Sequence, residues 1–273
     1  MIFTNKWIKA VACGCEAALL AAFMAVVPQV IYAQVSTVAK PTVVLVHGAF
    51  AGSSSWNNVV AKLLAEGYPV VAVANPLRGV KSDASYVASL LDSITGPVIL
   101  VGHSYGGNVI SYAAIGKSQV KALVYVSGVA PDVGESASTL VGRFPGSTLG
   151  PTLAPPVVLA DGSKDLYIIQ DKYHAQFAAD VPLKESQLMA ATQRPITEAA
   201  LNEAGDTPAW KTVPSWFLYG SLDKNIPPAV HAFMAKRAGA KRTVEVKGAS
   251  HVVMISHPDA LVRLIDEAAA QAR

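Results

Sequence analysis

The sequence predicts an α/β fold, in which helices cover both faces of a mostly parallel sheet. Short runs of apolar, often β-branched residues alternate with segments whose apolar residues recur every three or four positions. The chain has 273 residues, of which 52% are hydrophobic and 15% are charged, so it can bury a large core. The 20 glycines and 17 prolines show no repeat or low-complexity bias, which excludes a fibrous or disordered protein.

Six apolar runs have the composition of strands that are covered on both faces. They span residues 42–46, 70–74, 98–101, 122–126, 216–219 and 243–246. Apolar stripes predict amphipathic helices around residues 56–64, 87–94 and 261–268. This alternation of strands with helices is typical of a parallel sheet with helices on both sides.

The alternation fails between about Pro131 and Lys211. The stretch begins rich in proline and glycine at residues 144–156, and it then predicts helices over 165–179, 183–191 and 197–204. Only residues 157–160 have the composition of a strand. We interpret residues 131–211 as a small helical cap inserted into a single domain that spans residues 34–273.

The first 33 residues have the pattern of a secretory signal peptide. Lys6 and Lys9 precede an apolar run at residues 17–27, and Pro28 and the segment 31–33 follow as a cleavage region. The alternative is an uncleaved anchor over residues 10–32, which Glu16 and Pro28 disfavour. We therefore expect a periplasmic or secreted protein with no stable membrane insertion after cleavage. Both cysteines, at positions 13 and 15, fall in this segment, so the mature chain holds no disulfide.

The strongest local motif is Gly102-His103-Ser104-Tyr105-Gly106-Gly107, which lies between a predicted strand and a predicted helix. A G-x-S-x-G pattern in this context is typical of a nucleophile elbow, a tight turn that exposes the serine hydroxyl above the sheet edge. Ser104 is therefore the candidate nucleophile. The alternative is a glycine-rich turn with a serine that caps the helix.

A second motif, His47-Gly48-Ala49-Phe50, directly follows the first strand. Acyl transfer needs two backbone N–H donors at the point where the oxyanion develops. We expect one from Tyr105, the residue after the nucleophile, and the other from Ala49, with Phe50 as the second choice.

A general base is expected in Gly248-Ala249-Ser250-His251, after the last strand. His251 is the only one of the six histidines in a loop that ends at the catalytic sheet edge and lies outside the first two motifs. His47 and His103 belong to those motifs, and His257 precedes Pro258. His174 and His231 are expected to be surface or packing residues.

The acid that orients the base is expected to be Asp223, in the loop after the strand at 216–219. Asp132 is the alternative, because it also follows a predicted strand at the same sheet edge. A turn after Pro131 would account for Asp132 without a catalytic role.

With these segments, residues 34–273 resemble the α/β-hydrolase superfamily, in which the triad also follows the order Ser, Asp, His. The match comprises the two glycine-containing loops, the segment from Gly220 to Pro227 and His251. The His47-Gly48-Ala49 loop, Trp56 and the small cap are similar to an esterase branch that holds plant methyl-ester hydrolases, hydroxynitrile lyases and bacterial pyrethroid-type esterases. The resemblance implies a Ser–His–Asp hydrolase that cleaves small, fairly apolar esters without a cofactor.

Two departures from the superfamily narrow the expected activity. Hydroxynitrile lyases of this branch carry Thr at the position of Gly48 and Lys at that of Val252, so the lyase activity is disfavoured. Dehalogenases and epoxide hydrolases use an aspartate nucleophile, whereas this chain has Ser104. Amidase, lactonase or perhydrolase activity with the same triad remains open, as does a non-catalytic small-molecule receptor.

The cap is expected to set the substrate. Aromatic side chains of this region are candidates to line an apolar pocket over Ser104, or else to pack the cap on the core. They are Phe144, Tyr167, Tyr173, Phe177 and Trp210.

The sequence has no spacing typical of a metal site and no dinucleotide fingerprint, and its net charge of +3 gives no reason to expect nucleic acid as a partner. The expected partner is a small-molecule ester, and the oligomeric state is not predicted.

Overall fold

The computed structural model describes residues 39–271 of the chain, which belong to one compact unit. The predicted signal peptide and both cysteines lie outside the described residues. Within the described part, no helix is both long and apolar enough to cross a membrane.

The core of the fold is a six-stranded sheet whose strands are all parallel. The strand order is β2-β1-β3-β4-β8-β9. The strands are β1 (Thr42–Val46), β2 (Val70–Val73), β3 (Val98–His103), β4 (Val120–Val126), β8 (Ser215–Gly220) and β9 (Arg242–Val246). The parallel sheet and its six strands are thus confirmed. Every residue of the central strand β3 is buried, as expected for a strand covered on both faces.

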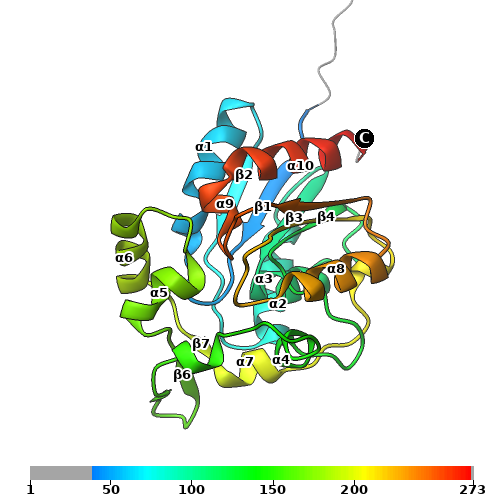
Figure 1. The fold of residues 1–273 in the computed structure, drawn as a ribbon. Coiled ribbons are helices and arrows are strands. Elements are labelled where there is room, and N and C mark those ends of the chain that lie inside the picture. The colour runs from blue at the N-terminus through cyan, green and yellow to red at the C-terminus, as the bar shows by residue number, and fades with distance from the viewer. Residues whose placement is uncertain (1–38, 272–273) are drawn as a thin grey trace, which may run out of the picture. The chain divides into compact units, whose positions relative to one another are not determined.

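Helices cover both faces of the sheet, as Figure 1 shows. One layer contains α1 (Asn57–Ala65), α9 (Val253–Ser256) and α10 (Pro258–Gln271), with the short 3-10 helix η1 (Ser53–Trp56) before α1. The other contains α2 (Val80–Asp92), α3 (Tyr105–Ala113) and α8 (Pro228–Arg237). Because the strands are parallel, the loops after β1, β3, β4, β8 and β9 all leave the same edge of the sheet. All the predicted chemistry lies in these loops.

A long insertion connects β4 to β8. Its helices are α4 (Ala137–Val141), α5 (Gln170–Phe177), α6 (Leu183–Ala191) and α7 (Glu198–Asn202), with the 3-10 turns η2 (Gly150–Thr152) and η3 (Ala209–Lys211). Its strands β5 (Val157–Val158), β6 (Lys164–Leu166) and β7 (Ile196–Thr197) form a small antiparallel sheet. In Figure 1 the parts of this insertion lie along the left and lower sides of the molecule.

The structure corrects one predicted helix of the insertion. Residues 165–169 are not helical, because Asp165 and Leu166 pair with β7 in the antiparallel sheet and Asp165 also binds Arg78 Nη1 at 2.6 Å. Helix α5 therefore begins only at Gln170. The predicted helix at 197–204 is shorter as well, since Thr197 accepts the Ala200 amide proton and caps α7.

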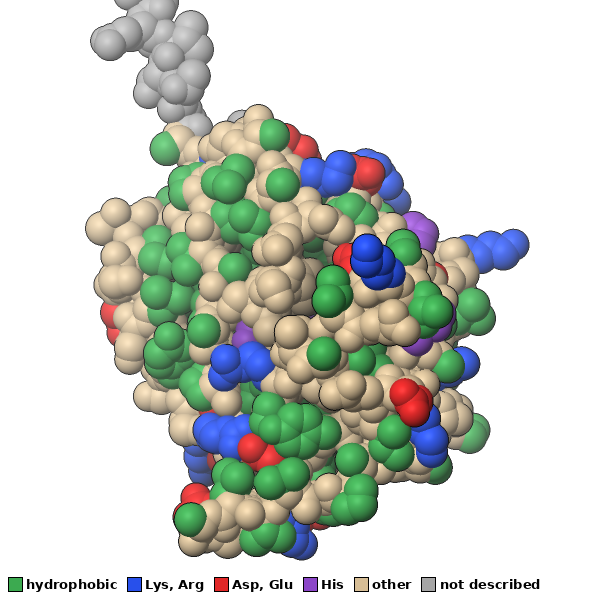
Figure 2. All heavy atoms as spheres, turned by 90° about the vertical axis from the view of Figure 1, so that its left-hand side faces the viewer, with side chains coloured by type: hydrophobic (Ala, Val, Ile, Leu, Met, Phe, Trp, Pro, Cys, Tyr) green, Lys and Arg blue, Asp and Glu red, His purple; other side chains and the backbone are tan. Residues whose placement is uncertain are grey.

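The two ends of the insertion are tied together. Trp210 Nε1 donates a hydrogen bond of 2.7 Å to the Pro131 carbonyl, and Lys211 Nζ lies 2.6 Å from Asp132 Oδ1. Figure 2 shows the face on the left of Figure 1, where small groups of charged side chains of both signs lie among neutral and hydrophobic ones.

Candidate active site

Ser104 lies between β3 and α3 in a strained backbone conformation, with φ 53° and ψ −125°. A residue other than glycine adopts positive φ only at a cost, and such strain is often stored at functional sites. The turn is possible because glycines flank it: a Cβ on Gly102 would lie 2.5 Å from the Gly106 carbonyl oxygen, and one on Gly106 would collide with the Val46 carbonyl. The side chain of Ser104 keeps a small exposed surface.

His251 and Asp223 form a buried pair at the same sheet edge. Nδ1 of His251 lies 2.7 Å from Oδ2 of Asp223, and both side chains are inaccessible to solvent. The other carboxylate oxygen, Oδ1, accepts the amide protons of Asn225 at 2.8 Å and Ile226 at 2.9 Å. Nε2 of His231 also lies 3.2 Å from Oδ2, so four donors surround the carboxylate.

These donors keep Asp223 ionised. Burial alone would raise the pKa of the carboxyl group, but the charge of His251 and the hydrogen bonds from His231 and His251 outweigh it and hold the pKa below its usual range. A carboxylate in this position accepts the proton on Nδ1 and so fixes the orientation and tautomer of the His251 ring. The remaining ring nitrogen, Nε2, is buried and has no hydrogen-bond partner among residues 39–271. This nitrogen carries the lone pair with which a general base accepts a proton.

Two backbone amides are available next to Ser104. Ala49 and Tyr105 both line the cavity at Ser104, and within the described chain neither amide donates a backbone hydrogen bond. By contrast, the Phe50 amide donates to the Arg194 carbonyl at 2.9 Å. The structure therefore favours Ala49 over Phe50 as the second oxyanion donor.

Asp132, the alternative acid, takes part in a hydrogen-bond network that does not include His251. Its Oδ1 binds Lys211 and accepts the Val133 amide proton at 2.7 Å. Both partners belong to the neck of the insertion, and no contact between Asp132 and His251 is present in the described structure. The geometry thus brings together Ser104's loop, Asp223 and His251, and it leaves Asp132 out.

His231 is the residue whose position the sequence did not reveal. Its Nε2 lies 3.2 Å from Oδ2 of Asp223, the oxygen that His251 also contacts. The expectation of a packing residue is met in part, because the ring is buried and stacks on Tyr219. Its sequence signal was weak: it lies in a helix eight positions after Asp223, where the predicted chemistry was confined to loops.

The cavity at Ser104 is small and mostly apolar. Besides Ser104 it is lined by Ala49, Phe50, Tyr105, Val129, Ala137, Val141, Leu149, Leu201, Asn225 and Ile226. Four of these residues, Ala137, Val141, Leu149 and Leu201, also line a larger open groove between α4 and the segment 144–153. The groove gives an apolar extension of the site toward the surface.

The lining of this cavity shows that the aromatic residues expected over Ser104 do not form its walls. None of Phe144, Tyr167, Phe177 and Trp210 lines the cavity at Ser104. Phe144 lines the adjoining groove and packs on Phe233, and Trp210 ties the neck of the insertion. Tyr167 is half-buried, and its carbonyl accepts the Ala154 amide proton.

Phe177 packs the cap on the core, which is the alternative that the sequence left open. The fully buried ring packs edge-on against His251 at a centroid distance of 5.0 Å, and it also contacts the rings of Phe50, His103 and Tyr173. It therefore supports the histidine from the side of the cap. Large aromatic residues of the cap pack it on the core here.

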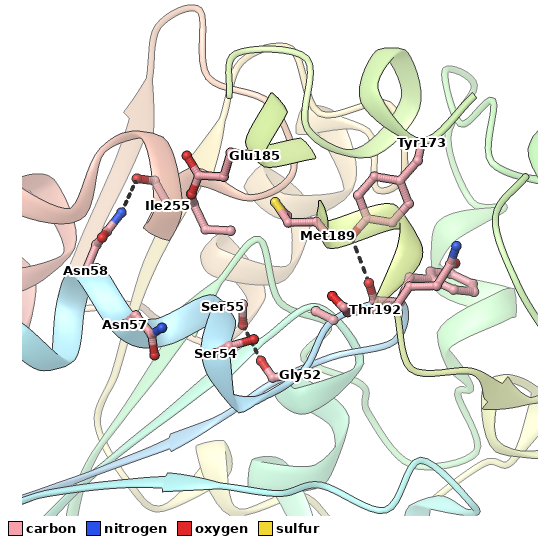
Figure 3. A pocket seen from close by; sticks show the side chains of 13 residues that line it. Gly52, Ser54, Ser55, Asn57, Asn58, Tyr173, Glu185, Met189, Thr192 and Ile255 are labelled. Carbon is pink, nitrogen blue, oxygen red and sulfur yellow. Dashed lines mark hydrogen bonds between the residues drawn. The ribbon is translucent and has the colours of Figure 1, made fainter. Parts of the chain in front are cut away.

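A second cavity lies beside Phe50, between α1 and the cap helices α5 and α6 (Figure 3). At about 170 Å³ it is larger than the cavity at Ser104, which has about 50 Å³. Several of its polar side chains are already engaged: Asn58 donates to the Ile255 carbonyl at 3.3 Å and Ser55 to the Gly52 carbonyl at 2.7 Å. Tyr173 donates to the Phe50 carbonyl at 2.8 Å. Phe50 is the residue common to the two cavities.

In the described part of the chain, no group of three or more His, Cys, Asp or Glu side chains is arranged to hold a metal ion.

Comparisons with known proteins agree with this fold. The sequence model described as "Alpha/beta hydrolase family" matches residues 43–264. An alpha/beta hydrolase, nvfD, from Aspergillus novofumigatus is 28% identical over 254 residues, covering 85% of this chain and 98% of that protein. Methylesterase 7 from Arabidopsis thaliana is 26% identical over 247 residues, covering 83% of this chain and 95% of that protein. The crystal structure of polyneuridine aldehyde esterase superposes with a TM-score of 0.73 at 19% identity, covering 84% of this chain and 99% of that one.

Proposed function

Because the chain belongs to the alpha/beta hydrolase family, we propose that it is a serine carboxylesterase with Ser104 as nucleophile, His251 as base and Asp223 as acid. Esterase-type activity is supported by relatives that are named as methylesterases and by the fold shared with an esterase. The specific triad and the substrate class are our own assignments.

One observation carries the proposal. A carboxylate and an imidazole are paired in a fully buried position, and among the described residues the second ring nitrogen has no hydrogen-bond partner. This nitrogen lies at the sheet edge that also presents Ser104, and a free imidazole nitrogen there can accept the proton of a nucleophile. A serine on a strained turn and a base with a free lone pair are what nucleophilic acyl transfer requires.

The proposed reaction follows from these positions. Oγ of Ser104 attacks the ester carbonyl carbon while Nε2 of His251 takes the hydroxyl proton. The carbonyl oxygen becomes an oxyanion that accepts hydrogen bonds from the amides of Ala49 and Tyr105. His251 then gives the proton to the leaving alcohol as the C–O bond breaks, and the acyl group stays on Ser104. Water, deprotonated by the same Nε2, releases the acid and restores the serine.

The apolar lining supports small to medium, fairly apolar esters as substrates. The cavity at Ser104 accepts a short acyl or alkyl group, and the groove beyond Leu149 and Leu201 accepts a longer one. No Lys or Arg side chain lines either space, so a carboxylate or phosphate on the substrate would find no charged partner there.

Two other functions are compatible with parts of the site. An amidase, lactonase or perhydrolase would use the same three residues, and only assays on those substrates separate them from an esterase. A non-catalytic receptor would keep the pocket without needing a base and an acid. The buried pair of Asp223 and His251 favours an enzyme over a receptor.

The decisive experiment compares the wild type with Ser104→Ala on p-nitrophenyl acetate and butyrate, together with labelling by a fluorophosphonate. We expect Ser104→Ala to lower kcat by about 10⁴ to 10⁶ and to abolish labelling, because triad members act as a unit. Ser89→Ala, at an exposed position of α2, is the matched control and should behave as wild type. Turnover within tenfold of wild type in Ser104→Ala would overturn the assignment.

We also propose that the protein is exported, on the pattern of residues 1–33 alone. N-terminal sequencing of the protein from its native host should give a mature chain that starts at or near Gln34. An intact Met1 end in the membrane fraction would favour the anchor instead.

A further inference from the structure

Asp223 interacts with two imidazole rings. Oδ2 lies 2.7 Å from Nδ1 of His251 and 3.2 Å from Nε2 of His231, which projects from α8. Because a carboxylate oxygen can only accept, both ring nitrogens carry the proton and donate. The triad alone requires just one of these two hydrogen bonds.

The surroundings of His231 determine which of its two ring nitrogens donates a hydrogen bond. The ring is 1% exposed and stacks on Tyr219 at a centroid distance of 4.9 Å and an interplanar angle of 18°. Its Nδ1 is buried and has no hydrogen-bond partner among the described residues. Protonating Nδ1 would bury an N–H group with nothing to accept it, which costs more than an unused lone pair. The geometry therefore favours the tautomer of His231 that donates to Asp223 through Nε2–H.

We propose that His231 is a positioning residue: its Nε2–H holds the Asp223 carboxylate in place and takes up part of its negative charge, so that His251 loses its proton at a lower pH than it would beside Asp223 alone. The inference rests on the proposed function, since it concerns the base of that reaction. A base that is free of its proton at a lower pH extends the active range toward acid.

The other titratable groups around His231 and His251 are neutral, so they do not change the charge that acts on His251. His103 lies against His251 with ring centroids 4.8 Å apart, and burial holds its pKa well below the usual range, so it is neutral. Its Nε2 contacts the His251 carbonyl at 3.2 Å. On the far side of His231, burial and then the nearby Glu245 raise the pKa of Tyr219, which is also neutral. Asp223 is the charged group that both imidazoles contact directly.

The test uses two substitutions that separate the donor from the ring. His231→Phe keeps an aromatic ring to stack on Tyr219 but removes the donor. His231→Gln keeps an N–H donor near the position of Nε2. The measurement is kcat/KM for p-nitrophenyl acetate as a function of pH, whose acidic limb reports the ionisation of the free enzyme's base.

We expect the acidic limb of His231→Phe to move upward by about half to one pH unit, because the full charge of Asp223 then acts on His251. The limb of His231→Gln should stay close to wild type. A limb that moves in neither variant, with activity lowered equally in both, would mean that His231 only packs, and the inference would be wrong.

A second measurement uses only the wild-type protein, so it depends neither on activity nor on the folding of a variant. In the wild type, NMR titration of the imidazole nitrogens should show His231 as a neutral Nε2–H ring throughout the pH range in which His251 titrates. A His231 that gains a proton in this range would overturn the inference. If the wild type hydrolyses no ester and takes up no fluorophosphonate, the proposed function fails, while the NMR titration still decides the role of His231.

Discussion

Gly48 lies directly against Ser104: a Cβ on Gly48 would be 2.6 Å from the Cβ of Ser104 and 2.7 Å from the His103 carbonyl oxygen. The loop after β1 and the turn after β3 therefore touch backbone to backbone. This close approach sets Ala49, which follows Gly48, next to Ser104 in the wall of one cavity.

Gly48→Ala should damage both the fold and the proposed reaction. The added methyl group has no room, so either the turn or the loop must shift, at a cost of about 1–3 kcal/mol in the free energy of unfolding. The same shift would move the Ala49 amide from the position of the oxyanion, where one lost donor costs about 10² to 10³ in kcat. Thermal unfolding and ester hydrolysis measure the two effects. Gly150→Ala is the control for stability, because a Cβ there meets nothing within 4 Å; an equal loss of stability at the two positions would contradict the argument.

The burial of His47 predicts that the free energy of unfolding depends on pH. Its Nδ1–H donates to the Gly48 carbonyl at 2.9 Å, and its Nε2 accepts the Asn75 amide proton at 3.1 Å. Protonation would place a second donor against that amide. Burial, with a smaller contribution from the charge of Arg194, lowers the pKa of His47 to about 4, against an opposing contribution from Gly48.

The direction of the effect follows from proton uptake. Between pH 6.5 and 4 the unfolded chain binds a proton at position 47 and the folded chain does not, so the free energy of unfolding falls as the pH falls. This histidine should account for a loss of about 3 kcal/mol over that range. Urea unfolding at several pH values should therefore show a flatter dependence for His47→Gln than for wild type, even if the variant is less stable at pH 7. A slope that stays at the wild-type value in His47→Gln would contradict the argument.

The sequence was most informative where local chemistry leaves few choices. A β-branched run such as that of β3 is compatible with little except a doubly covered strand, and the glycines around Ser104 permit a turn that other residues would block. The pairing of Asp223 with His251 followed because both loops leave neighbouring parallel strands, β8 and β9. Positions fixed by the sheet could thus be inferred from the order of the motifs.

Positions fixed by long-range packing could not be inferred in this way. His231 meets Asp223 because α8 packs against β8, and no local sequence pattern predicts this contact. The aromatic residues of the cap, such as Phe177, face the junction with the core instead of the cavity at Ser104. Asp165 was assigned to a helix because a two- or three-residue strand leaves no periodicity to detect.

Leu149 lines both the cavity at Ser104 and the open groove. Leu149→Ala should therefore raise the ratio of kcat/KM for p-nitrophenyl octanoate to that for the acetate by about tenfold, the scale of a single hydrophobic contact in a pocket. Leu188→Ala, at a position of α6 that is 64% exposed, is the control and should leave the ratio unchanged. A uniform loss for both esters in Leu149→Ala would mean that the groove does not hold the substrate.

The two candidate acids give the sharpest comparison. Asp223→Asn keeps the shape of the side chain but removes the charge that holds the proton of His251 on Nδ1, so the free nitrogen facing the substrate is lost. We expect kcat to fall by about 10⁴, as in serine proteases with the equivalent change. Both variants and the wild type should be assayed at the same pH, near 8.

Asp132→Asn should lower kcat by less than about tenfold, because this carboxylate binds Lys211 at the neck of the insertion and takes no part in the proton path. Its ion pair is partly exposed, so its loss should cost about 1 kcal/mol or less in the free energy of unfolding. Lys211→Met removes the same ion pair from the other side and should reproduce the small effect of Asp132→Asn on both kcat and stability. If instead Asp132→Asn abolishes turnover and Asp223→Asn does not, the acid lies after β4, and the assignment of Asp223 is wrong.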